Sequence, residues 1–277
     1  MASSILQSAV SGLHLNAQRV GAAADNIANV STNGYKDTQI LARSVTTAQG
    51  TSPTYAPGGV QAISRQLADV QGLLAPSATS TDLALSGAGF FAVSRTSDPV
   101  SIQDASAGKA LFTRDGSFAP DSEGFLVNSS GFYLLGQKSS GANGVLSAVN
   151  VSRVGDGADG NVTGVSVSAE GRVTALFDNG NTSTISDIPV AVFTHPAGLA
   201  AETGGVFHAT DFSGRATFFK AGSDRAGAIQ SGALELSTTD IGTEFSNMIM
   251  AQSAYKASLS VIKVADEMSR QLLDETA

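Results

Sequence analysis

The hydrophobic pattern is most regular at the two ends of the chain. Near the start, apolar residues alternate spacings of four and three for three heptads, which are the a and d positions of a coiled coil. This N-terminal row consists of Leu6, Val10, Leu13, Ala17, Val20, Ala24 and Ile27. A C-terminal row repeats the spacing with a single polar member, and consists of Ile241, Phe245, Met248, Gln252, Tyr255, Leu259 and Ile262. Both ends are therefore predicted to be helical.

Start and stop signals agree with two terminal helices. Ser3 or Ser4 can cap the first helix, and Asn33-Gly34 lies just beyond its end. Glu244 would lie in the first turn of the second helix, against the positive end of the helix dipole. The candidate caps of that helix are Thr238, Thr239 and Asp240.

Between the helices the pattern changes to short β-branched or aromatic runs bounded by Gly and Asn. Phe90–Val93, Gly124–Val127 and Arg172–Phe177 are examples. Asp115-Gly116 and Asn179-Gly180 are dipeptides typical of two-residue hairpin turns. This part of the chain is predicted to be mainly β.

These patterns predict an α+β fold in which N- and C-terminal coiled-coil-like helices pack together and a mainly-β domain intervenes. Residues 1–40 with 232–277 would form a helical assembly domain, and residues 76–231 the β domain. Residues 41–75 contain prolines and a Gly-Gly pair without clear periodicity, so they are predicted to be an extended linker.

The two apolar rows also admit a simpler interpretation, because an apolar stripe at helical spacing usually packs within its own domain. Two of the seven members of the N-terminal row are alanine, as are several neighbouring residues of the same segment, which permits close helix approach but buries little area. At about 25 cal/mol per Å² of buried apolar area, an alanine-rich helix pair is marginal as an isolated unit. We therefore expect helices of neighbouring subunits to complete the packing, which makes both rows a candidate assembly interface.

Composition and charge exclude several classes of function. The net charge is −8 and the 16 Lys and Arg residues are scattered, which argues against a nucleic-acid partner. The chain has no Cys, so disulfides and thiolate metal sites are excluded. No run approaches about 18 apolar residues, and the first thirty residues lack the pattern of a cleaved secretory signal. We expect no membrane span and no cleaved signal peptide.

No set of residues points to catalysis, a metal or another cofactor. The histidines are His14, His195 and His208, and a zinc site would need two of them brought together with carboxylates. Gly155–Asn161 is rich in Asp and Gly but lacks EF-hand spacing, which favours a turn over a calcium loop. Gly87–Gly89 precedes a strand instead of a phosphate-binding helix. Asp121 and Glu123 lie near a glycine turn that they are expected to solvate.

The segment Asn26–Lys36 resembles the signature that ends the first helix of the bacterial flagellar hook and distal-rod family, an Asn-Ile-Ala-Asn segment followed by Thr-x-Gly-Tyr/Phe-Lys. Further segments resemble the family in the same order along the chain. They are Thr81–Phe91, Arg114–Phe118, Asp121–Gly136, Ile188–Phe193, Pro196–Leu199, Gln230–Ser237, Phe245–Ile249, Ala251–Tyr255 and Val261–Met268. Asn33 and Ser253 depart from the usual residues of the family, which are proline and arginine.

The resemblance implies a structural subunit that polymerises into the hook or distal-rod tube and transmits motor torque to the filament. Its implied partners are further copies in a helical homopolymer, other axial proteins, hook cap or rod components, and the type III export apparatus. The implied location is the hook or basal body of the flagellum. Gly171–Phe193 resembles hook proteins and the short middle resembles the distal rod, and we favour the hook. The alternative is a secreted β-rich adhesin or carbohydrate-binding protein.

Overall fold

The computed structural model describes residues 2–46, 57–105, 109–138, 144–152, 162–223 and 225–275. The chain divides into two compact units. The first contains residues 1–30, 37–67 and 239–277, and the second contains residues 31–36 and 68–238. The first unit holds both terminal helices and the second is mainly β, which confirms the α+β class.

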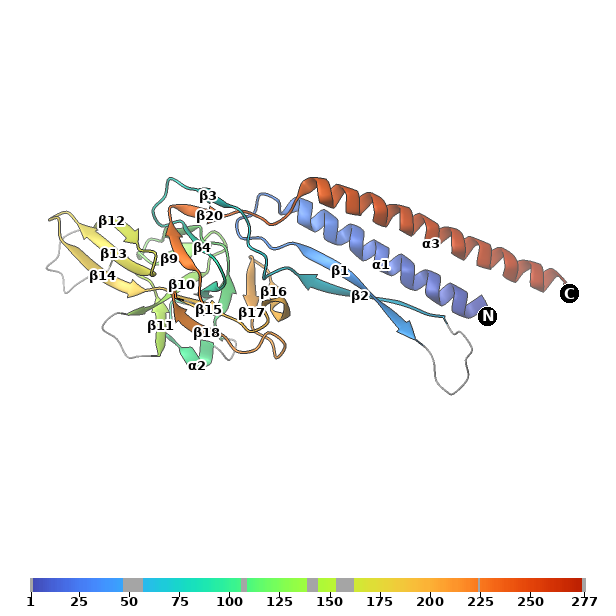
Figure 1. The fold of residues 1–277 in the computed structure, drawn as a ribbon, viewed down its shortest axis with the longest axis horizontal. Helices are drawn as coiled ribbons and strands as arrows, with labels where there is room; N and C mark the ends of the chain where they lie inside the picture. The colour runs from blue at the N-terminus through green and yellow to red at the C-terminus, as the bar shows by residue number, and fades with distance from the viewer. Residues whose placement is uncertain are drawn as a thin grey trace. The chain divides into compact units, whose positions relative to one another are not determined.

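The first unit consists of two long helices and a two-stranded ribbon. Helix α1 (Ala2–Ala28) and helix α3 (Ile241–Glu275) lie side by side and run antiparallel (Figure 1). Strands β1 (Thr38–Thr46) and β2 (Pro57–Gln66) pair antiparallel and pack against α1. No described helix is long and apolar enough to cross a membrane.

The predicted linker 41–75 differs from the structure. Much of it forms strands β1 and β2, which pair with each other. Leu41 and Ile63, for example, lie opposite each other in this ribbon. The sequence signal was weak since Leu41 and Ile63 are 44% and 42% exposed, so no fully buried face imposes a clear alternation. Residues 47–56, with Pro53, lie outside the described part of the chain.

The helix caps were predicted with mixed success. Helix α1 already includes Ser3 and Ser4, so neither is its N-cap and that prediction is wrong. For α3, Asp240 is the cap, because its Oδ1 accepts a hydrogen bond of 2.7 Å from the backbone N–H of Thr243. This bond lowers the pKa of Asp240 below its usual value. Glu244 lies in the first turn, as predicted.

The second unit is built on a twisted 14-stranded sheet with two additional strand pairs. The main path through the sheet is β12-β13-β14-β10-β5-β7-β17-β16. Its strands are β12 (Val162–Val167), β13 (Arg172–Phe177), β14 (Thr182–Asp187), β10 (Tyr133–Lys138), β5 (Phe90–Ser94), β7 (Leu111–Thr113), β17 (Val206–His208) and β16 (Ala200–Glu202). Branches are β6 (Val100–Ser101), β8 (Phe118–Pro120), β9 (Leu126–Asn128), β11 (Val145–Ala148), β15 (Pro189–Val192) and β18 (Thr217–Lys220). The separate pairs are β4 (Leu83–Ser86) with β19 (Ala228–Ser231), and β3 (Leu74–Pro76) with β20 (Ala233–Glu235). Two short helices, α2 (Ile102–Asp104) and η2 (Pro196–Gly198), complete the unit.

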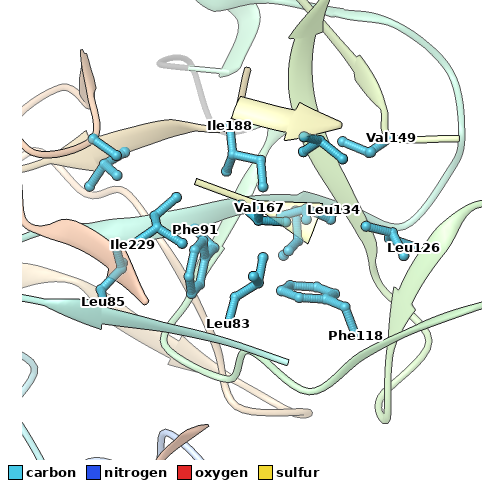
Figure 2. Packing of buried hydrophobic residues seen from close by; sticks show 14 of the residues in the cluster. Leu83, Leu85, Phe91, Phe118, Leu126, Leu134, Val149, Val167, Ile188 and Ile229 are labelled. Carbon is cyan, nitrogen blue, oxygen red and sulfur yellow. The ribbon is translucent and has the colours of Figure 1, made fainter. Parts of the chain in front are cut away.

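Strand β5 explains why the second unit has two hydrophobic clusters. Successive side chains of a strand point to opposite faces, and every residue of β5 is buried. Phe91 and Val93 belong to one cluster, which Figure 2 shows in close view, whereas Phe90 and Ala92 belong to the other. Because β5 is covered on both faces, its sequence is a continuous apolar run.

The two predicted hairpin turns had different outcomes. Asn179-Gly180 joins β13 to β14, which pair antiparallel, and Gly180 has φ +81°, so the hairpin is confirmed. The turn is longer than the two residues predicted, because the N–H of Phe177 donates to the carbonyl oxygen of Asn181 across it. Asp115-Gly116 lies between β7 and β8, which pair with other strands, so the hairpin prediction is wrong there. Gly116 instead allows close approach of backbone, since a Cβ on it would lie 1.6 Å from the carbonyl oxygen of Leu83.

Candidate assembly interface

The N-terminal row lies beside the face of α1 that is buried within the chain. The buried residues of α1 are Ala9, Leu15, Asn16, Ala23 and Asn26, and none of them belongs to the row. Val10 is 42% exposed, and Ala17 and Ala24 are also exposed. Leu6, Leu13, Val20 and Ile27 are half-buried. The chain therefore leaves much of this row accessible.

The C-terminal row is divided between two faces of α3. Met248 and Ile262 are half-buried, on the side of the buried residues Glu244, Ala251 and Ala265. The remaining members are exposed: Ile241 at 44%, Phe245 at 51%, Tyr255 at 37% and Leu259 at 38%, together with Gln252.

Small residues bring the two helices together. A Cβ on Gly12 of α1 would lie 3.2 Å from Oγ of Ser258 on α3, so the helices approach closely at this point. The Oγ of Ser11 in α1 donates a 2.8 Å hydrogen bond to the carbonyl oxygen of Ser8. It also accepts a 3.1 Å hydrogen bond from the backbone N–H of Val60 in β2. Contacts of this kind bury little apolar area, so larger apolar side chains remain exposed beside them.

Asn26 connects the end of α1 to β1. Its side-chain amide donates to Oδ1 of Asp37 and to the carbonyl oxygen of Thr38 at 3.0 Å, and its Oδ1 accepts from the N–H of Thr38 at 2.9 Å. Asn26 is only 1% exposed, so leaving these groups unpaired would be costly. The first Asn of the Asn-Ile-Ala-Asn segment thus has a structural role at this turn.

Two acidic side chains lie near this junction in the first unit. Burial raises the pKa of Asp37 above its usual value, although hydrogen bonds from Gln39 and Asn26 oppose the shift. Burial also raises the pKa of Glu244, and the negative charge of Asp37 adds to that shift. Glu244 is only 6% exposed.

The second unit contains a buried charged cluster of Lys36, Arg114 and Glu235. The ammonium group of Lys36 pairs with Oε1 of Glu235, and Nη1 of Arg114 lies 2.9 Å from Oε2 of the same carboxylate. The side chains of Lys36 and Glu235 are 0% exposed, and that of Arg114 is 3% exposed. Burial lowers the pKa of Lys36 and of Arg114, and the attraction of Glu235 opposes both shifts.

Backbone groups add hydrogen bonds to the charged cluster. The N–H of Gly72 donates to Oε1 of Glu235 at 2.8 Å, and Nη2 of Arg114 donates to the carbonyl oxygen of Gly87 at 2.9 Å. Gly34 donates its N–H to the carbonyl oxygen of Glu235 at 2.7 Å. The cluster therefore joins residues from three distant parts of the sequence within one unit.

Sequence reasoning did not single out the charged cluster. Lys36, Arg114 and Glu235 each lie inside a segment that carries the family resemblance, but charged residues are mostly exposed, so nothing in the segments marks these three as buried. A possible signal was their location in otherwise apolar or glycine-rich segments, because a charge in such surroundings is buried only with a partner.

The histidines do not form a metal site in the described part of the chain. There, no group of three or more His, Cys, Asp and Glu residues could hold a metal ion. Nδ1 of His208 lies 3.2 Å from Oε1 of Glu202, and this pair joins the edge strand β16 to its neighbour β17. The Gly155–Asn161 segment lies outside the described residues.

Comparison with known proteins matches three consecutive parts of the chain to flagellar families. Residues 6–36 match the flagella basal body rod protein family. Residues 84–175 match the D1 domain of the flagellar hook protein FlgE/F/G family, and residues 230–275 match the C-terminal part of the flagellar basal body rod FlgEFG family. This chain belongs to the flagellar hook and rod family. The matched parts include both terminal helices and all three residues of the charged cluster.

Individual relatives within the hook and rod family divide between the two kinds of protein. The flagellar hook protein FlgE of Caulobacter vibrioides is 37% identical over 115 residues, which are 42% of this chain and 20% of the relative. FlgE of Brucella abortus is 35% identical over 173 residues, which are 62% of this chain and 39% of the relative. The flagellar basal-body rod protein FlgG of Buchnera aphidicola subsp. Baizongia pistaciae is 27% identical over 278 residues, covering 95% of this chain and 96% of the relative. The chain thus spans less than half the length of these hook proteins. These relatives are structural proteins and not enzymes.

Proposed function

We propose that this chain is a structural subunit of the flagellar axial tube, and that it polymerises with further copies of itself through its terminal helices. The observation that carries the proposal is the set of apolar positions left exposed on α1 and α3, within a chain of the hook and rod family. Burial of these positions between subunits would supply the packing that the alanine-rich pair lacks. The comparisons give no support to the adhesin or carbohydrate-binding alternative.

The proposed packing is coiled-coil-like, with the N- and C-terminal rows closed by helices of neighbouring subunits. Protomers related by a helical operator form an open-ended tube instead of a closed ring. Other axial proteins, with hook cap or rod components, would contact the ends of this tube. The chain would reach the tube through the type III export apparatus.

Charge placed in the N-terminal row tests the proposal. Val10→Asp puts a carboxylate on an exposed row position, where the isolated chain can keep it in water. In the tube the same carboxylate would be desolvated in every subunit, at a cost of several kcal/mol. Leu13→Asp and Ile262→Asp extend the test to half-buried positions of both rows. The matched control is Gln18→Asp, on an exposed position of α1 outside the row.

We expect Val10→Asp to prevent tube formation, seen by electron microscopy, while the control assembles. Thermal unfolding of the β unit should be the same in both variants. Normal tubes from all three row variants would show that the rows do not form the contact between subunits.

Two observations bear on the kind of tube. The match over 96% of a rod protein favours the rod, whereas the higher identity over a shorter stretch favours the hook. Expression in strains that lack either their hook protein or their rod protein separates the two. In the strain without its hook protein, a hook subunit restores hooks on the complete rods. In the strain without its rod protein, a rod subunit completes the rods, which otherwise stop early.

A further inference from the structure

The first unit contains an open groove. Its floor is α1 and its walls are β1 and α3, and its volume is about 490 Å³. The lining includes Ala22 from the floor, Ile40 and Leu41 from one wall, and Met250 and Ala254 from the other. Met250 is 62% exposed and Leu41 is 44% exposed, so both walls carry accessible apolar side chains. The lining also includes polar and charged residues, which are Asn16, Arg19, Thr38, Gln39, Glu244 and Asn247.

The α3 wall of the groove continues as an apolar row that sequence analysis did not identify. Its members recur at spacings of four and three, and are Met250, Ala254, Ala257, Val261, Val264 and Met268. All six are exposed, with Val261 at 46%, Val264 at 53% and Met268 at 45%. At 100° per residue, this groove row lies roughly a quarter turn from the buried positions Ala251 and Ala265.

Charged residues avoid the groove row. At the same 100° per residue, the charged side chains in this part of α3 lie about 100–160° around the helix from the centre of the groove row. They are Lys256, Lys263, Asp266, Glu267 and Arg270. A helix with one charged side and one apolar side normally buries the apolar side, and this one is exposed in the single chain. The groove row therefore has the composition of a contact surface.

We propose that helix α1 of a second copy occupies this groove and packs its N-terminal row against the groove row of α3. The inference rests on the proposed function, and it names the contact through which copies meet. The N-terminal row has the same heptad spacing as the groove row, and Val10, Ala17 and Ala24 are exposed. Equal spacing is what lets side chains of two helices interdigitate along their length.

The lengths of the two rows agree. At 1.5 Å per residue, Leu6 to Ile27 spans about 32 Å and Met250 to Met268 spans about 27 Å, so nearly the whole groove row can be covered. Alanines in both rows permit the close approach that a groove requires. The contact joins different surfaces of the two copies, so each copy keeps a free α1 row and a free groove. Such a contact propagates into a filament and does not stop at a dimer.

Cysteine pairs test the contact cleanly because the chain contains no Cys. Three double variants are made, and each combines Val261→Cys with Val10→Cys, Ala17→Cys or Ala24→Cys. The three positions along α1 sample different registers of the contact. The matched control combines the same three changes with Lys263→Cys, which lies two residues away on the charged side of α3. Assembled tubes are oxidised mildly and analysed by denaturing, non-reducing electrophoresis.

We expect at least one of the pairs with Val261→Cys to give a ladder of covalent oligomers, and the Lys263→Cys pairs to give none. A ladder requires each chain to bond to two neighbours. Chains with one of the two cysteines alone identify the kind of contact: a contact between different surfaces gives no cross-link in them, whereas a like-to-like contact gives dimers. Tubes without a Val261→Cys ladder, or equal ladders from Lys263→Cys, would overturn this inference and leave the proposed function standing. A native chain that forms no tube under assembly conditions would overturn both.

Discussion

Glu235→Gln should destabilise the second unit strongly. The substitution keeps the size of the side chain and an acceptor for the N–H of Gly72, but it removes the negative charge that Lys36 and Arg114 share. Those two cations are 0% and 3% exposed, so water cannot replace the carboxylate. Removing one partner of a buried ion pair costs about 3–5 kcal/mol. This is a large part of the roughly 5–15 kcal/mol that stabilises a typical domain.

A matched substitution on the surface separates charge loss from burial. Glu202 pairs with Arg95, and their side chains are 32% and 67% exposed. Exposed ion pairs contribute about 0–1 kcal/mol, so Glu202→Gln should have little effect. For a unit of this size, the cost of Glu235→Gln corresponds to a fall in melting temperature of about 6–20 °C. The melting temperature of Glu202→Gln should stay close to that of the native chain.

Urea unfolding followed by circular dichroism measures the free energy of unfolding of each variant. Hydrogen exchange should show the loss first at the amides of Gly34 and Gly72, which donate to Glu235. Lys36→Met should cost less in the Glu235→Gln chain than in the native chain, because the two side chains interact. Equal stability of Glu235→Gln and Glu202→Gln would refute the reasoning, as would additive costs of Lys36→Met and Glu235→Gln.

Two further predictions concern a close backbone approach and pH. Gly34→Ala should destabilise the second unit far more than Gly180→Ala. Both glycines have positive φ, but a Cβ on Gly34 would lie 2.5 Å from backbone atoms, whereas a Cβ on Gly180 meets nothing within 4 Å. Equal urea midpoints of the two variants would contradict this prediction. Asp37 and Glu244 have raised pKa values, so the folded chain binds more protons than the unfolded chain between the usual and the raised pKa. The α1–α3 pair should therefore gain stability as pH falls from neutral through the raised pKa values, and Glu244→Gln should reduce this gain in hydrogen-exchange protection.

The elements with strong local signals were predictable from sequence. The terminal helices have long apolar periodicity, and Asp240 caps α3 through a local hydrogen bond. Asn179-Gly180 is also local, because the turn and its two strands are adjacent in sequence. Asp115-Gly116 failed for the opposite reason. Its conformation serves a contact between Gly116 and Leu83, which are far apart in sequence.

The charged cluster could not be predicted from the sequence, for a related reason. Lys36, Arg114 and Glu235 are far apart in sequence, and each one alone has the composition of a surface residue. Their meeting depends on β20 pairing with β3 and on the backbone approach at Gly34. Local patterns carry no information about such long-range pairing, so a single sequence cannot distinguish a buried ion pair from two solvated charges.

Apolar spacing alone does not determine which side of α3 forms a contact surface. Apolar residues are frequent along this helix, so more than one set of positions satisfies the four-three spacing. The row chosen from spacing, from Ile241 to Ile262, is interrupted by Gln252 and lies partly on the side that carries Lys256 and Lys263. The row from Met250 to Met268 has no polar member. Charged residues mark a side of α3 that a contact through the groove row leaves in water, since desolvating an unpaired charge costs more than burying an alanine returns. For a chain that completes its packing only with other copies, the positions of charges are therefore a better guide to the contact surface than the positions of apolar residues.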